Sequence, residues 1–202
     1  MALQARERVP DVTAAIAVDG RRQRSADSRQ RILSAMRALI QEGKPDPAAE
    51  DVAQRAGVGL RTVFRLFRDM ESVCAEMLIP QRQVFFACFT SPFTRPAGRA
   101  RLHELFDRLA ELYEANMPLR RAGSIRRYSS PSLAAAMLEL DNAVAGFIRG
   151  QLTDTSPSYV YRLEMLTFLM SYDSWMRLRD QQALGPNETK ALLDQAINAA
   201  LA

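Results

Sequence analysis

Apolar side chains recur every three or four residues along most of the chain, and no segment sustains the strict alternation that a half-buried strand requires. One such stripe, typical of an amphipathic helix, consists of Ile32, Leu33, Met36, Leu39 and Ile40. Comparable patterns predict helices at about 48–56, 60–67, 70–89 with a kink or break at Pro80, 98–116, 132–152, 158–183 and 187–201. The sequence therefore predicts an all-α fold, with a three-helix head followed by a helical body.

Composition excludes several classes of protein. No apolar run reaches the roughly 18–20 residues that a membrane span needs, and the N-terminus lacks the apolar core of a signal peptide. Two cysteines cannot form a disulfide framework, and a single histidine, His103, excludes histidine-rich metal sites. We therefore expect a cytoplasmic protein with no membrane partner, no metal and no cofactor.

The excess positive charge is concentrated near the N-terminus. Residues 1–70 hold 13 lysines and arginines against 9 acidic residues, whereas residues 71–202 hold 14 of each kind. A basic end on a neutral body is typical of a protein that binds a polyanion, although a solvated arginine-rich tail has the same composition. Because residues 1–26 carry no sustained apolar period, we expect a flexible basic arm there, followed by a helix with Ser25 or Asp27 as its N-cap.

Two short predicted helices, 48–56 and 60–67, are separated by a tight turn that contains Gly57. We expect the first helix to begin with Asp46 as the N-cap and Pro47 in the first helical position. Glycine tolerates the positive φ at which such a helix ends. A pair of short helices joined in this way is typical of a helix-turn-helix motif.

The second of these helices carries the residues expected to contact a partner. Arg61 and Arg65 are four residues apart and therefore share one face. In a major groove, that face can reach base edges with its arginines while Thr62 and backbone N–H groups hold phosphate. The pattern favours double-stranded DNA as a partner, and an ordinary helical hairpin with solvated arginines is the alternative.

Residues 28–73 resemble the TetR family of bacterial transcriptional regulators. The resemblance is carried by 31–35, 52–58 and 62–67, followed by Glu71. The rest of the chain is similar to the family only in architecture, a helical body that ends in two long helices. The resemblance implies a homodimeric repressor that binds a partly palindromic DNA operator and is released from it by a small-molecule effector.

The resemblance also assigns roles to residues. Thr62 is expected to contact phosphate, Arg61 and Arg65 to face the groove, and Phe64 to pack beneath the recognition helix. The predicted DNA-binding residues are Gly59, Leu60, Arg61, Thr62, Phe64, Arg65, Lys44, Arg22 and Arg24. The predicted divisions are a flexible basic arm at 1–26, a helix-turn-helix DNA-binding domain at 27–70, and a helical ligand-binding and dimerisation domain at 71–202.

The predicted helix 158–183 is apolar on nearly every side over its first half, as expected of a helix that is buried all round. In a chain of this size, one face can meet its own core, and a second copy of the chain is the economical cover for the other. The alternative is that this helix and the last one lie inside a single thick core. The predicted dimer interface consists of Tyr172, Trp175, Leu192, Ala196 and Ala199.

Methionines and aromatic residues lie mostly after residue 70, where a flexible apolar cavity would suit a small-molecule effector. The predicted pocket residues are Phe106, Tyr113, Met117, Met137, Phe147, Met165 and Phe168. The same side chains would equally serve as plain core.

Taken together, these features predict a DNA-binding transcriptional regulator, and more specifically a homodimeric repressor that responds to a ligand. An enzyme is not expected, because the sequence has no phosphate loop, nucleophile elbow, metal-ligand cluster or recognisable pair of carboxylates. The alternatives are a helical protein-interaction module and a regulator without a small-molecule ligand.

Overall fold

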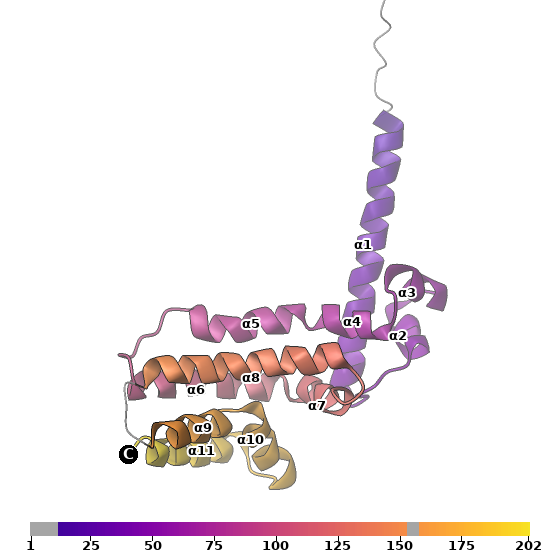
Figure 1. Ribbon diagram of the computed structural model, residues 1–202. Helices are drawn as coiled ribbons and strands as arrows, with labels where there is room; N and C mark the ends of the chain where they lie inside the picture. The colour runs from indigo at the N-terminus through magenta and orange to yellow at the C-terminus, as the bar shows by residue number, and fades with distance from the viewer. Residues whose placement is uncertain (1–11, 153–157) are drawn as a thin grey trace, which may run out of the picture.

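The computed structural model describes residues 12–152 and 158–202 (Figure 1). Within these residues every regular element is helical, which confirms the predicted all-α fold. The elements are α1 Val12–Gln41, α2 Ala49–Ala56, α3 Leu60–Leu66, α4 Met70–Met77, α5 Ile79–Thr90, α6 Arg99–Ala115, α7 Met117–Arg126, α8 Pro131–Gln151, α9 Tyr159–Leu169, α10 Tyr172–Met176, the π-helix η1 Arg177–Gln181, and α11 Pro186–Ala200.

The head is built on the predicted apolar stripe of α1. Ile32 and Met36 are fully buried against α2 and α3. The helix α1 ends at Gln41, shortly before Gly43, which has a positive φ. The same hydrophobic cluster includes residues of α4 and α7. The packing of the head therefore extends beyond residue 70, and α4 and α7 join it to the body. The buried residues that these two helices add are Val73, Met77, Leu119 and Ala122.

The body is a second hydrophobic cluster, centred on α6. Figure 1 shows α5, α6 and α8 lying lengthwise beside one another, with α9, α10 and α11 along one side of them. The α6 stripe fills the interior, as its spacing of three and four residues requires. Its fully buried members are Leu102, Leu105, Phe106 and Leu109.

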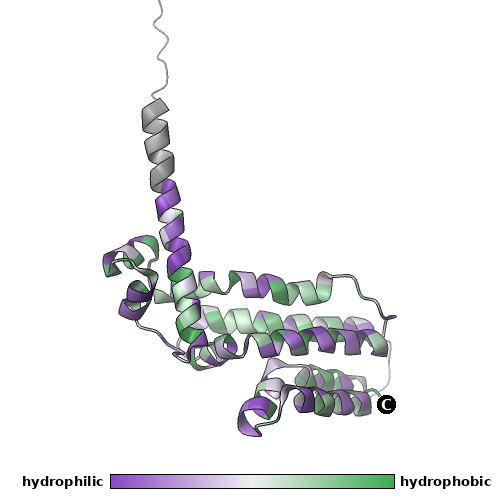
Figure 2. Cartoon of the chain, turned by 180° about the vertical axis from the view of Figure 1, so that it is seen from behind, coloured by the Kyte–Doolittle hydropathy of each residue, from purple (hydrophilic) through white to green (hydrophobic). Residues whose placement is uncertain are grey.

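The boundary predicted at residue 26 is wrong, because α1 is helical from Val12 onward. Residues 1–11 of the predicted arm lie outside the described residues. Neither Ser25 nor Asp27 caps the helix; Asp27 instead accepts a hydrogen bond from the Gln23 amide at 2.9 Å, one turn earlier. A polar segment needs no apolar stripe when it continues a helix that is already packed, since propagation costs less than nucleation. Figure 2 shows this change from hydrophobic to hydrophilic along α1.

The single helix predicted at 158–183 is also wrong, because it is broken between Leu169 and Tyr172. Ser171 has an extended backbone, and its hydroxyl accepts a hydrogen bond from the Ser174 N–H at 3.2 Å, which starts α10 in a new direction. Residues 153–157 lie outside the described residues. The segment between the helices predicted at 98–116 and 132–152 contains a further helix, α7, which the sequence patterns did not predict.

No helix in the described parts of the chain has the length and apolar character needed to cross a bilayer.

Candidate DNA-binding surface and effector cavity

The turn between α2 and α3 is formed by local hydrogen bonds. Gly57 has φ +63°, and its N–H donates to Gln54 O while Val58 N–H donates to Ala53 O, which confirms the predicted glycine turn. The predicted cap at Asp46 and Pro47 is wrong, because the N-cap of α2 is Ala48, two residues later.

The side chain of Asp51 stabilises the start of α2. It accepts a hydrogen bond from the Ala48 N–H at 2.9 Å and pairs with the Lys44 ammonium at 2.5 Å. Both contacts lower the pKa of the Asp51 carboxyl, and the contact with Lys44 has the larger effect. Lys44, which lies in the turn between α1 and α2 and was predicted to bind DNA, therefore already has an anionic partner in α2.

The faces of α3 are clearly separated. Val63 is 0% exposed and Phe67 is nearly so, and these two side chains fill the angle against α1 and α2. Phe64 is 49% exposed, so the expectation that it packs beneath the recognition helix is wrong. One residue along a helix turns a side chain by about 100°, and this step carries Phe64 outward beside Leu60.

Arg61 and Arg65 are both exposed on the outward face of α3, beside Phe64 and Leu60. Neither guanidinium forms an ion pair or hydrogen bond with any residue that the structure describes. Thr62 is half-buried, and its backbone N–H donates to the Gly59 carbonyl at 2.8 Å. The outward face of α3 thus presents two positive charges and two apolar side chains to solvent.

Arg22 and Arg24 are exposed on the part of α1 that extends past α2 and α3 (Figure 1). Together with Arg61 and Arg65 they make this end of the molecule basic. Arg68, next to α3, is also exposed and pairs with the neighbouring Asp69 at 2.9 Å.

Arg29 joins three elements and was missed by the sequence analysis. Its Nε donates to Glu76 of α4 at 2.6 Å, and its Nη1 donates to the Leu66 carbonyl at the end of α3 at 2.7 Å. Its guanidinium also lies 4.2 Å from the centre of the Phe67 ring. The available signal was an arginine three residues before Ile32, on the apolar stripe of α1.

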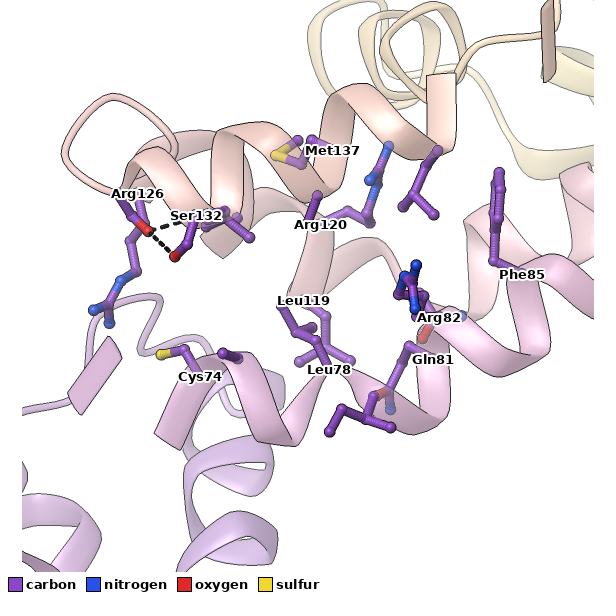
Figure 3. A pocket seen from close by; sticks show the side chains of 18 of the residues that line it. Cys74, Leu78, Gln81, Arg82, Phe85, Leu119, Arg120, Arg126, Ser132 and Met137 are labelled. Atoms are coloured by element: carbon purple, nitrogen blue, oxygen red, sulfur yellow. Dashed lines mark hydrogen bonds between the residues drawn. The ribbon is translucent and has the colours of Figure 1, made fainter. Parts of the chain in front are cut away.

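A cavity of about 210 Å³ lies among α4, α5, α6, α7 and α8 (Figure 3). Of the seven predicted pocket residues, only Tyr113 and Met137 line it. The others occupy the core or the surface. Phe106 and Met117 are buried in the body cluster, Phe147 packs against it, and Met165 and Phe168 are exposed.

The end of the cavity nearest the head contains polar groups. Glu71 of α4 accepts hydrogen bonds from the hydroxyls of Ser130, at 2.8 Å, and Ser132. Both hydroxyls lower the pKa of the Glu71 carboxyl, and that of Ser132 has the larger effect. Burial raises the pKa of the nearby Cys74 thiol, which therefore stays protonated at neutral pH.

Arg126, at the same end, connects the cavity wall to the head. Its guanidinium donates to Asp46 in the turn between α1 and α2 at 2.7 Å. Figure 3 shows Cys74, Arg126 and Ser132 at one end of the cavity and Arg82 and Phe85 at the other.

Several large apolar side chains are exposed on α9, and another is exposed on α11. Tyr161 is 79% exposed, and Val160, Met165, Phe168 and Leu192 are also large exposed side chains. We call these five residues the α9 face. Because α9 packs against both α8 and α11, this face is the outer side of the terminal helices.

Two of the predicted interface residues need correction. Tyr172 is 1% exposed and Trp175 is 2% exposed, so both are buried within this chain and neither is accessible to a partner. The break at Ser171 turns them into the core, where Tyr172 packs edge-on to Tyr113. Ala199 is exposed and Ala196 is half-buried on α11. Their part in an interface, with that of Leu192, stays a prediction.

Comparisons with known proteins identify the fold. No protein-family model matches the sequence, and no curated protein matches it. Solved structures do match. A transcriptional regulator from Rhodococcus sp. Rha1 is 16% identical with a TM-score of 0.62, covering 88% of this chain and 95% of that one. A protein from Mesorhizobium loti MAFF303099 that is assigned to the TetR family of transcriptional regulators is 21% identical with a TM-score of 0.59, covering 88% and 96%.

A transcriptional regulator from Pseudomonas aeruginosa PAO1 is 16% identical with a TM-score of 0.57, covering 88% of this chain and 90% of that one. The likeness in each case extends over head and body together. The likeness defines a two-part, all-α fold that this chain shares with these three proteins, one of which is assigned to the TetR family. This chain has that fold at low sequence identity.

Proposed function

We propose that this chain is a DNA-binding transcriptional regulator of the TetR type, which acts as a homodimeric repressor and is released from its operator by a small molecule. The observation that carries the proposal is the outward face of α3. Its two arginines have no partner within the described residues, while Val63 and Phe67 anchor the opposite side of the helix. An arginine without an intramolecular partner is available for bidentate contacts to guanine or phosphate.

Dimerisation follows from the reach of α3. Its seven residues can read only a few base pairs. In a dimer, the second α3 would read a second half-site and so double the length of DNA that is recognised. The α9 face supplies the apolar surface that such a dimer would bury, since monomers rarely leave a large contiguous apolar patch in water.

Effector release is supported by the position of the cavity. Its wall includes Glu71 and Cys74 of α4, the helix that directly follows α3, and Arg126, which is bonded to Asp46 of the head. A ligand that fits the cavity better in one arrangement of α4 than in another would shift the two α3 helices of a dimer relative to each other. Such coupling requires different ligand affinities in the two states.

The test is a double substitution, Arg61→Ala with Arg65→Ala, assayed by gel retardation of the DNA upstream of the chain's own gene. Each specific base contact contributes about 1–3 kcal/mol, so we expect operator affinity to fall by about 30-fold or more while the dimer remains intact. The charge-matched control is Arg149→Ala with Arg177→Ala. Both residues are exposed in the body, and neither has a partner among the described residues. Equal loss in both variants, or no retardation by the wild type at low salt, would contradict the proposal.

A further inference from the structure

The side chains that line the cavity carry an excess of positive charge. Its charged members are Arg82, Arg120, Arg126 and Glu71. Two of the arginines already have carboxylate partners, Glu139 for Arg82 and Asp46 for Arg126. The Arg120 guanidinium has neither an ion pair nor a hydrogen bond with any residue in 12–152 or 158–202.

The guanidinium of Arg120 makes a cation–π contact with an aromatic ring. It lies 4.4 Å from the centre of the Tyr172 ring, which is buried in the body core. Such a cation–π contact occupies none of the N–H groups with a hydrogen-bond acceptor, so they stay available as donors to a ligand. Two parallel N–H groups on one edge of a guanidinium match the two oxygens of a carboxylate.

The protein's own carboxylates do not neutralise this group. Asp141 of α8 lies within electrostatic range of Arg120, yet no ion pair within 4 Å joins the two side chains. Partial burial raises the pKa of the Asp141 carboxyl, and the attraction of Arg120 offsets this only in part. The charge on Arg120 is thus available to a ligand in the cavity.

The remaining walls are mostly apolar. Figure 3 shows the Arg120 side chain reaching from α7 toward α8, with Leu78, Leu119 and Met137 around it. The volume, about 210 Å³, is below the roughly 300–1,000 Å³ of sites for drug-sized ligands. The cavity therefore suits a small molecule with an apolar body and a single anionic end.

We propose that the effector is a small monocarboxylate with an apolar body, whose carboxylate pairs with the edge of the Arg120 guanidinium and whose apolar part fills the space between α4, α5 and α8. This inference rests on the proposed regulatory function and names the chemical class of its ligand. Arg120 is the specificity-determining residue, because an uncharged amide of the same shape offers only one acceptor oxygen to the paired N–H groups and no charge to balance the guanidinium.

Calorimetric titration of the full chain without DNA tests the ligand class. The probes are octanoate and phenylacetate, each compared with its neutral amide, octanamide and phenylacetamide. We expect each acid to bind at least about tenfold more tightly than its amide, because hydrogen bonds between two charged groups are stronger than those to a neutral group. In Arg120→Gln this preference should disappear while amide binding persists, which also shows that the cavity is intact.

Two further variants sharpen the test. Arg120→Lys keeps the charge without the paired edge, so it should keep a smaller preference for the acids. Arg121→Gln is the matched control, since Arg121 is the next residue of α7, pairs with Asp180 and does not line the cavity. It should keep the full preference. Amides binding as tightly as acids, unchanged acid binding in Arg120→Gln, or no binding of either acid would overturn the inference.

Gel retardation measured in parallel separates this inference from the proposed function. Retardation of operator DNA without acid binding would overturn the ligand class and leave the regulator in place. Acid binding without retardation would overturn the regulator and leave the anion site in place. Release of retarded DNA by octanoate in the wild type, but not in Arg120→Gln, would support both.

Discussion

Arg29 shows how one side chain can fix the position of the recognition helix. Its guanidinium contacts the carboxylate of Glu76, the carbonyl of Leu66 and the ring of Phe67, which belong to α4 and to the end of α3. A hydrogen bond to a carbonyl at the end of a helix satisfies an acceptor that the helix itself leaves unpaired. One side chain of α1 therefore connects α4 to the end of α3.

Two glycines in the helix-turn-helix segment have opposite requirements, which the same substitution can reveal. Gly57 has φ +63°, where a side chain costs about 1–2 kcal/mol, so Gly57→Ser should lower the free energy of unfolding by about that amount. Gly59 is the N-cap of α3, with an extended backbone and open space around it. Gly59→Ser should instead add a few tenths of a kcal/mol. Urea unfolding measures both, and equal effects would contradict the assignment.

Helices with a single apolar stripe could be predicted from the sequence. The polar beginning of α1 and the separate start of α10 could not, because neither depends on such a stripe. The bounds of α2, α3, α6, α8 and α11 follow the sequence patterns within about two residues. The polar beginning of α1 is invisible to a pattern that seeks buried faces. The break at Ser171 was missed because a run of apolar residues continues on both sides of it, and only the capping hydroxyl marks the change of direction.

The same limit applies to the candidate site. The charged face of α3 could be predicted because Arg61 and Arg65 are four residues apart. Which side chain of α3 points inward could not be predicted. The adjacent apolar residues 63 and 64 fit the apolar stripe equally well until the angle between α2 and α3 is known. The cavity depends on five helices brought together by tertiary packing. Spacing within any one of them therefore identified few of its lining residues.

The loop between α5 and α6 is anchored by Glu104, and this gives a prediction for acid pH. Burial alone would raise the pKa of Glu104, but the N–H groups of Thr94 and Arg95, with the Arg108 guanidinium, lower it to about 2. Its folded-state pKa is below the unfolded value of about 4.3, so its contribution to stability is complete above that value and is lost as the pH falls toward 2. In Glu104→Gln, the loss of stability between pH 4.3 and 2 should be smaller than in the wild type.

Thermal unfolding at a series of pH values measures this difference. The control is Glu111→Gln, an exposed position on the same helix, which should keep the pH dependence of the wild type. If the stability of Glu104→Gln fell more steeply with decreasing pH than that of the wild type, the lowered pKa assigned to Glu104 would be contradicted.

At the scale of the whole molecule, α4 and α7 connect the head to the cavity of the body. Both helices contribute buried residues to the head cluster and also line the cavity. A ligand in the cavity therefore contacts the elements that close the head core. This arrangement gives the head and the body a shared wall, so that coupling between effector and DNA requires no long chain of intermediate contacts.

The α9 face makes a final prediction about assembly. A glutamate in place of Met165 would place a charge at the centre of the proposed interface, where desolvation without a partner disfavours association. We expect Met165→Glu to scatter light as a monomer of 22.6 kDa, whereas the wild type should give about twice that mass. Val84→Glu, at another exposed apolar residue, on α5, is the matched control and should remain dimeric. In the proposed function one copy of α3 would read only half of an operator, so the monomeric variant should also retard operator DNA far more weakly than the control. A wild-type protein that is monomeric would contradict the proposed interface. A monomeric Met165→Glu variant that binds operator DNA as tightly as the Val84→Glu control would contradict the part of the interface in DNA recognition.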